Sequence, residues 1–207
     1  GGLPDGTVDA GTLATDSVSA VKIAANSVDS AELIDGSIDT SHIAANQITS
    51  AIMPAGSVLQ VVSVTKSNTS TMAGSTAWTD VPNLSVAITP SSTSSKILIV
   101  ASMTLASGNH AHPRMLRGST AIGNGASAGS RPGVFGYANN PGGVNSGTSN
   151  AYNYLDSPNT TSATTYKIQI NNSNGSSACY VNRTQSDADG VYSGRGVSSI
   201  TLLEIGA

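Results

Sequence analysis

The chain has 207 residues, of which 10% are charged and 4% aromatic, and its formal net charge is −3 at pH 7. It contains no run of about 18 apolar residues, which excludes a membrane-spanning helix. A single cysteine excludes an intrachain disulfide and a cysteine metal cage, and the lack of a basic cluster argues against nucleic-acid binding.

Residues 6–55 are five consecutive copies of a ten-residue unit, from GTVDAGTLAT to NQITSAIMPA. A large apolar residue stands at every fifth position of this array. These residues are Val8, Leu13, Val18, Ile23, Val28, Leu33, Ile38, Ile43, Ile48 and Met53. A straight helix would rotate each by about 140° from the last, and a continuous strand would alternate them between faces. The chain must therefore bend between them.

Each unit carries the residues of such a bend. It opens with Gly, Asp or Asn, has Val or Ile at its third place, and has Asp, Ser or Thr at its fourth. The last group caps short helical turns well, so we expect a short extended piece plus a compact turn in each unit. Two large apolar residues in ten are too few for one chain to bury, so we expect three chains to share a core. The strict period of five disfavours a disordered linker and a heptad coiled coil.

Units such as NSVDSAELIDGSIDT and DGSIDTSHIAANQIT resemble the decapeptide arrays in tail fibres of tailed bacteriophages. The resemblance covers residues 5–55 and implies a fibrous, trimeric virion protein. The array carries no catalytic residues that could be transferred. We accordingly expect a stalk at 1–55 and a head at 56–207. Because the chain begins with Gly1 rather than Met, we expect the remainder of the fibre to precede it.

The head alternates strand-like segments with turns. We predict strands at 58–65, 78–89 (two pieces broken at Pro82-Asn83), 96–105, 112–122 (a hairpin), 152–155, 165–171, 178–184 and 199–205. Even spacing, Gly- and Asn-rich turns and no long helix indicate an all-β fold, a jelly-roll-like β-sandwich. The segment at 97–100 is apolar on both faces, so we expect a neighbouring subunit to provide its second cover.

The order of these segments resembles the trimeric heads of C1q and tumour-necrosis-factor proteins. That resemblance implies neighbouring termini near the stalk and partner-binding loops at the far end. Residues 1–55 hold seven acids and one base, whereas residues 56–207 hold five acids and eight bases. The positive head suits a mildly anionic target such as a bacterial surface polysaccharide.

Catalytic motifs are weak. The segment at 125–129 (GASAG) fits the G-x-S-x-G pattern, but the following Ser-Arg-Pro-Gly will not open the helix that a nucleophile elbow needs. Asp187 and Asp189 resemble the start of a calcium loop whose downstream acid is missing. We predict no enzyme activity and no cofactor.

His110 and His112 form an H-x-H pair. In phage fibres that the chain resembles, three such pairs around a threefold axis bind a metal, and six imidazole nitrogens would suit octahedral iron. Those pairs lie in fibrous shafts, whereas this one lies in the head beside Pro113. We therefore favour a surface loop and predict no metal.

Recognition is expected in the loops at 106–114, 123–150 and 185–196, where Tyr rings can stack on sugars and Asn amides can bind hydroxyls. The candidate receptor-binding residues are Asn109, His110, His112, Arg114, Arg131, Tyr137, Asn139, Asn140, Tyr152, Arg183, Asp187, Asp189 and Arg195. The strand at 165–171 alternates, so we expect Tyr166, Ile168 and Ile170 in the core and Lys167 and Gln169 on the outer face.

These features predict the tip of a tail fibre in the extracellular virion, a homotrimer that adsorbs to the host without covalent chemistry. Its partner would be a surface polysaccharide or an outer-membrane protein, with no nucleic acid and no membrane insertion. One alternative is a structural module whose head caps and registers the trimer. Another is a polysaccharide-degrading spike, which the few acidic residues of the head disfavour.

Overall fold

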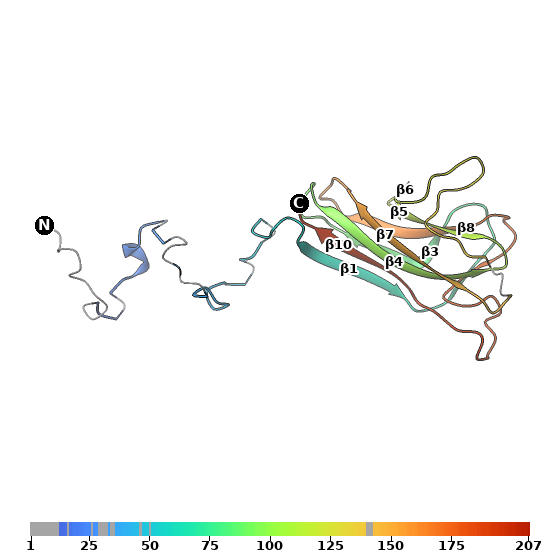
Figure 1. Cartoon of the computed structure of the whole chain (residues 1–207), viewed down its shortest axis with the longest axis horizontal. Helices are drawn as coiled ribbons and strands as arrows, with labels where there is room; N and C mark the ends of the chain where they lie inside the picture. Colours follow the sequence, from blue (N-terminus) through green and yellow to red (C-terminus); the bar gives the residue numbers. More distant parts are fainter. Residues whose placement is uncertain are drawn as a thin grey trace. The chain divides into compact units, whose positions relative to one another are not determined.

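The computed structural model describes residues 13–15, 17–25, 27–28, 33, 36–45, 47–49, 51–139 and 143–207. Contacts divide the chain into two units, Gly1–Thr49 and Ser50–Ala207, and the second contains the described strands (Figure 1). Val8 and Asn140, both named above, lie outside the described residues. No helix in the described ranges is long and apolar enough to cross a membrane.

Turns recur with the period of the repeat in the first unit. The N–H groups of Ser17, Ser27 and Gln47 each donate to the carbonyl oxygen three residues earlier, at 3.0, 3.1 and 3.2 Å. These three residues occupy the second place of their units. The predicted bend between units is therefore present at these boundaries.

A second turn follows the fourth place of the unit. His42 N–H donates to Asp39 O at 3.1 Å, and the Asp39 carboxylate accepts from Ser41 N–H at 2.8 Å. The corresponding turn two units earlier is the short 3₁₀ helix η1 (Ala20–Lys22). The capping role predicted for the fourth place is confirmed at Asp39.

The apolar residues of the array are uncovered in a single chain. The nine that the structure describes, from Leu13 to Met53, are 38% to 55% exposed. Such side chains are the main source of stabilisation on burial, at about 25 cal/mol per Å². One copy of the chain thus gives this array no core of its own.

The head is a sandwich of two antiparallel sheets. The long strands of sheet A, in spatial order, are β1 (Val58–Lys66), β10 (Ser198–Ile205), β4 (Lys96–Ser107) and β7 (Thr148–Asp156). The short strands β2 (Ser70–Met72) and β9 (Cys179–Val181) pair with each other, and β9 pairs with the last residues of β4. Sheet B contains β3 (Thr79–Ile88), β8 (Thr164–Asn172), β5 (Ala111–Arg117) and β6 (Thr120–Ala121), in that order.

The pairing of the strands confirms the jelly-roll-like fold. With β2 and β9 set aside, the first strand pairs with the last, the second with the seventh, the third with the sixth and the fourth with the fifth: β1–β10, β3–β8, β4–β7 and β5–β6. These are the pairs that one long hairpin makes when it is wound into two stacked sheets. Alternation then fills the space between the sheets with apolar side chains.

The core follows the predicted alternation. In β8, Tyr166, Ile168 and Ile170 are buried, while Lys167 and Gln169 lie on the other face. The expectation that Tyr166 belongs to the core is confirmed, since it is fully buried.

One predicted break is wrong. Residues 79–88 form the single strand β3, not two pieces, and its register against β8 shifts between Asp80 and Ser85. Asn83 has a φ of 58° inside this bulge. A bulge leaves residues unpaired, so it accommodates Pro82, which has no N–H to donate to the ladder.

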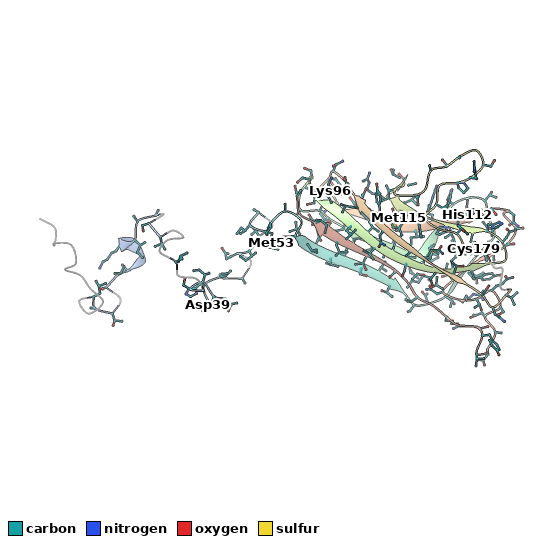
Figure 2. All side chains as sticks on the ribbon, viewed as in Figure 1. Asp39, Met53, Lys96, His112, Met115 and Cys179 are labelled. Carbon is teal, nitrogen blue, oxygen red and sulfur yellow. The ribbon has the colours of Figure 1, made fainter. Side chains whose placement is uncertain are left out.

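The two ends of the head lie side by side. Gly56 N–H donates to Gly206 O at 2.8 Å, and Gly206 N–H donates to Ser57 O at 2.9 Å. Strand β4 starts near this junction, because Lys96 pairs with Ile205, and it runs away to the turn that leads into β5. Figure 2 accordingly shows Lys96 and His112 at opposite ends of the sandwich.

The outer face of sheet A carries an apolar row. Val61, Leu203, Leu98 and Leu155 are successive cross-strand partners, and Val61 and Leu155 are 56% and 52% exposed. Val100, one row further along, is also exposed. The outward-facing residues of the predicted segment at 97–100, Leu98 and Val100, therefore have no second layer packed over them in a single chain.

Glu204 is a buried carboxylate at the junction end. It accepts hydrogen bonds from Ser91 N–H at 2.7 Å, Ser91 Oγ at 2.6 Å and Gln60 Nε2 at 2.5 Å. Burial raises the pKa of Glu204, but the hydrogen bonds outweigh it and hold the pKa below its ordinary value of 4.5.

This lowered pKa predicts acid-sensitive stability. Ionised Glu204 stabilises the fold at pH values above about 4.5, and the stabilisation disappears as the pH falls through the lower folded-state pKa. Glu204→Gln should cost about 1–3 kcal/mol at pH 7 and less at pH 3, measured by urea denaturation. Asp189→Asn, in an exposed loop, is the control. Equal stabilities of wild type and Glu204→Gln at pH 7 would contradict this account.

Candidate functional site

A cavity of about 480 Å³ lies on the outer face of sheet B, at the end of the head opposite the Gly56–Gly206 junction. His112 of β5 and Asn171 of β8, which are paired in register, contribute to its wall from the sheet. The loop at 122–139 covers them from the other side. The remaining lining residues are Thr76, Ser130, Arg131, Pro132, Val134, Tyr137 and Ser173.

The loop is attached to the edge of sheet B. Ala138 and Ala111 exchange backbone hydrogen bonds of 2.9 and 2.8 Å, and Phe135 N–H donates to Pro113 O at 3.2 Å. This pairing continues the edge of β5 beyond β6. The backbone around the cavity is therefore held by ladder-type hydrogen bonds, where the sequence predicted only a loop.

A second set of contacts anchors the start of the loop and corrects one prediction. Tyr152 is 4% exposed, its Oη donates to Ile122 O at 2.9 Å, and its ring lies 5.0 Å from that of Phe135. Tyr152 therefore supports the loop from the core and is not available to touch a receptor. The prediction that it binds directly is wrong, because its register in β7 places it on the inner face.

Partial burial favours the neutral form of the His112 imidazole. Burial lowers its pKa below 6.5, an effect that Asn171 opposes and the nearby His110 adds to. His112 Nδ1 and Asn171 Oδ1 are both closed off from solvent. On the sheet side, the cavity wall is therefore polar and uncharged, and Arg131 supplies the one charged side chain among the described lining residues.

A second cavity, of about 430 Å³, lies on the other side of Pro132, which lines both. Here Arg114 is stacked over Trp78, with the guanidinium carbon 4.0 Å from the ring centre. Arg114 also donates to Gln169 Oε1 at 2.6 and 3.0 Å. Gln169 Nε2 in turn donates to Asp80 Oδ1 at 2.6 Å, so the Arg114 side chain is held in place.

The loop at 185–196 forms a separate ionic cluster. The Asp187 carboxylate accepts from Arg195 at 2.9 and 3.0 Å and lies 3.8 Å from Arg183, and the hydrogen bond from Arg195 is the largest cause of the lowered pKa of Asp187. Asp187, Asp189 and Arg195 line a third depression. Asp187 is thus already paired with two arginines. The described part of the chain has no group of three or more His, Cys, Asp or Glu side chains that could hold a metal ion.

Asn109, His110 and Asn139 do not line the first cavity, and Arg183 lies over the Tyr180 ring, 4.5 Å from its centre. Asn109 Oδ1 accepts from His110 N–H at 2.8 Å, and His110 and Asn139 are exposed. Ser127 of the GASAG segment lies in the loop, and no described helix follows it, so no nucleophile elbow is formed.

Of the predicted residues, the structure brings His112, Arg131 and Tyr137 together in one cavity. It adds Asn171 and Thr76 to this cavity and Trp78 to the second one, and none of these three was predicted from the sequence. The alternation that placed Lys167 and Gln169 outward in β8 extends to the next outward position, so Asn171 could have been found.

No protein-family model matches the chain, and no curated protein is significantly similar to it. A functional assignment therefore depends on the repeats and on the geometry of these sites.

The loop geometry yields a testable prediction at Gly133. A Cβ at this position would collide with the backbone oxygen of Gly125, whose own N–H donates to Val134 O at 3.0 Å. Gly133→Ala should therefore cost about 1–3 kcal/mol of local stability and speed amide hydrogen exchange at Gly125 about tenfold or more. Gly190→Ala, where a Cβ meets open space, is the matched control. Unchanged exchange at Gly125 would show that the loop is not braced in this way.

Proposed function

We propose that the chain is part of a homotrimeric bacteriophage tail fibre whose head adsorbs the virion to the host surface. The observation that carries this proposal is the cavity formed by His112, Asn171, Arg131 and Tyr137 at the loop end of the head. Pockets of about 300–1,000 Å³ with a few convergent polar groups are typical binding sites. A surface polysaccharide or an outer-membrane protein is the proposed partner.

Two uncovered apolar surfaces support assembly into a trimer. The described fifth-position residues of the array are exposed in one chain, as is the row from Val61 to Leu155 on sheet A. The next outward row combines Ser63, Thr201, Val100 and Asn153, with no charge. Uncharged, partly apolar surfaces of this kind suit contact with further copies of the same chain.

Binding without catalysis is supported by the chemistry of the cavities. Among the described residues that line the two cavities on sheet B, none is Asp or Glu. Glycoside hydrolysis by the usual route needs a pair of carboxyl groups at a fixed separation. A polysaccharide-degrading activity therefore has no support at this surface.

The trimer predicts an effect of charge on sheet A. Val61→Asp places a carboxylate in the apolar row, and burying it unpaired at an interface is costly. We expect light scattering to give a trimer for the wild type and a smaller species for Val61→Asp. Ala188→Asp, in the exposed loop of the ionic cluster, should remain trimeric. A well-folded wild-type monomer at micromolar concentration would remove the proposal.

Adsorption predicts competition at the cell surface. The purified protein should bind host cells and block attachment of the phage, because it would occupy the same receptors. The main alternative is a head that only caps the trimer, which is compatible with the uncharged face of sheet A. Tyr137→Ala discriminates between the two, since Tyr137 is 67% exposed and its loss should leave the trimer intact. Weaker attachment of an intact Tyr137→Ala trimer supports recognition, whereas no effect of the substitution, or no binding of the wild type to host cells, supports a cap.

A further inference from the structure

The two cavities on sheet B repeat one chemical pattern. The first combines Arg131 with Tyr137, and the second combines Arg114 with Trp78. Pro132 is a wall of both, so the cavities are direct neighbours on one face. Each therefore contains a cation and an aromatic ring, and none of the described lining residues is acidic. Asp80, which accepts from Gln169, interacts electrostatically with Arg114 from outside the second cavity, whereas no carboxylate of the described residues forms an ion pair with Arg131.

Arg131 is the freer of the two cations. It is exposed, and its Nε donates to Ala128 O at 3.1 Å. A guanidinium has five N–H donors in a planar fork, so the Nη groups can take a carboxylate in a bidentate pair. Arg114, by contrast, donates twice to Gln169 and lies over the ring of Trp78. It therefore has fewer free N–H groups for an anion, and with Trp78 it forms a stacking surface, the Arg114–Trp78 platform.

The neutral groups of the first cavity suit a sugar. The exposed ring of Tyr137 offers a face of negative potential to the C–H groups of a pyranose. Neutral His112 can donate to or accept from a hydroxyl, and Ser130 and Ser173 add hydroxyls of their own. A hydroxyl-rich ring bearing one anionic group would meet a partner for each of its features.

We propose that the paired cavities bind consecutive residues of an acidic polysaccharide. A carboxylate-bearing sugar lies in the first cavity with its carboxylate on Arg131, and the adjacent sugar packs on the Arg114–Trp78 platform across Pro132. This inference rests on the proposed adsorption function and names the ligand class of the same surface. A neutral glycan, a phosphorylated glycan and a protein are the competing ligands.

The test uses pairs of ligands that differ only in charge. The full chain is titrated calorimetrically with tetrasaccharides of glucuronate, galacturonate, mannuronate and sialate. Each is compared with its carboxyl-reduced counterpart, in which the acid has become an alcohol. We expect at least one acid to bind at least tenfold more tightly than its reduced form, because reduction removes the partner of Arg131.

Substitutions of the two arginines test which cavity binds which sugar. Arg131→Gln should weaken binding of the acid about tenfold or more and leave binding of the reduced form unchanged. Arg114→Gln should weaken binding of the tetrasaccharide but not of the monosaccharide, which fills only the first cavity. Lys96→Gln removes one charge at the opposite end of the sandwich and should change neither affinity. Thermal unfolding of each variant checks that the fold is retained.

Each result of these titrations either supports or overturns the inference. Equal affinity for acid and reduced forms, or acid binding unaffected by Arg131→Gln, overturns the inference. Tighter binding of a phosphorylated tetrasaccharide than of every carboxylated one overturns the carboxylate assignment. If host cells bind the protein but no acidic oligosaccharide does, this inference fails and adsorption stands. If the acids bind through Arg131 but host cells do not bind the protein, adsorption fails and the ligand class stands.

Discussion

The double pairing of β4 is the constraint on which the rest of the head depends. Along one edge this strand pairs with β10 and then β9, and along the other it pairs with β7. With both edges occupied, its register cannot slip, because a shift of one residue would carry Ile97, Ile99 and Met103 from the core to the surface. The same register carries the chain from the Gly56–Gly206 junction to the far end, so β5 begins there and brings His112 into the cavity.

Alternating burial made most strands predictable from sequence. The pattern at 165–171 reports one buried face, and the structure has Tyr166 and Ile168 on it. Where pairing departs from alternation, prediction failed. Residues 79–88 were predicted as two strands, but they form one strand with a bulge around Asn83. Strand β2 has only three residues, too few to show a period in the sequence. Strand order could not be predicted from the sequence, because three of the four jelly-roll pairs join residues far apart in sequence. The exception is the hairpin β5–β6.

The site was predictable by residue type but not by place. His112, Arg131 and Tyr137 were singled out for their chemistry, yet they meet only because the loop returns to the β5 edge through the Ala111–Ala138 pairing. Composition cannot report such a contact. Tyr152 was predicted to bind the receptor but is buried. A tyrosine has the same chemistry on either face of a strand, and only the register of β7 places this one on the inner face. Its hydroxyl nevertheless serves the site, through Ile122.

The sandwich keeps the two proposed contact surfaces apart. The uncharged rows lie on the outer face of sheet A, and both cavities lie on the outer face of sheet B, with the apolar core between them. Contact between copies through sheet A would leave each cavity open to ligand. In the proposed trimer, three such cavities would bind a repetitive polymer together. Linkage would make the second and third contacts intramolecular and raise the overall affinity by about 10²- to 10⁴-fold, so a weak single site would be sufficient. Two arginines and two rings per copy, too few for tight binding alone, are consistent with binding through several linked sites.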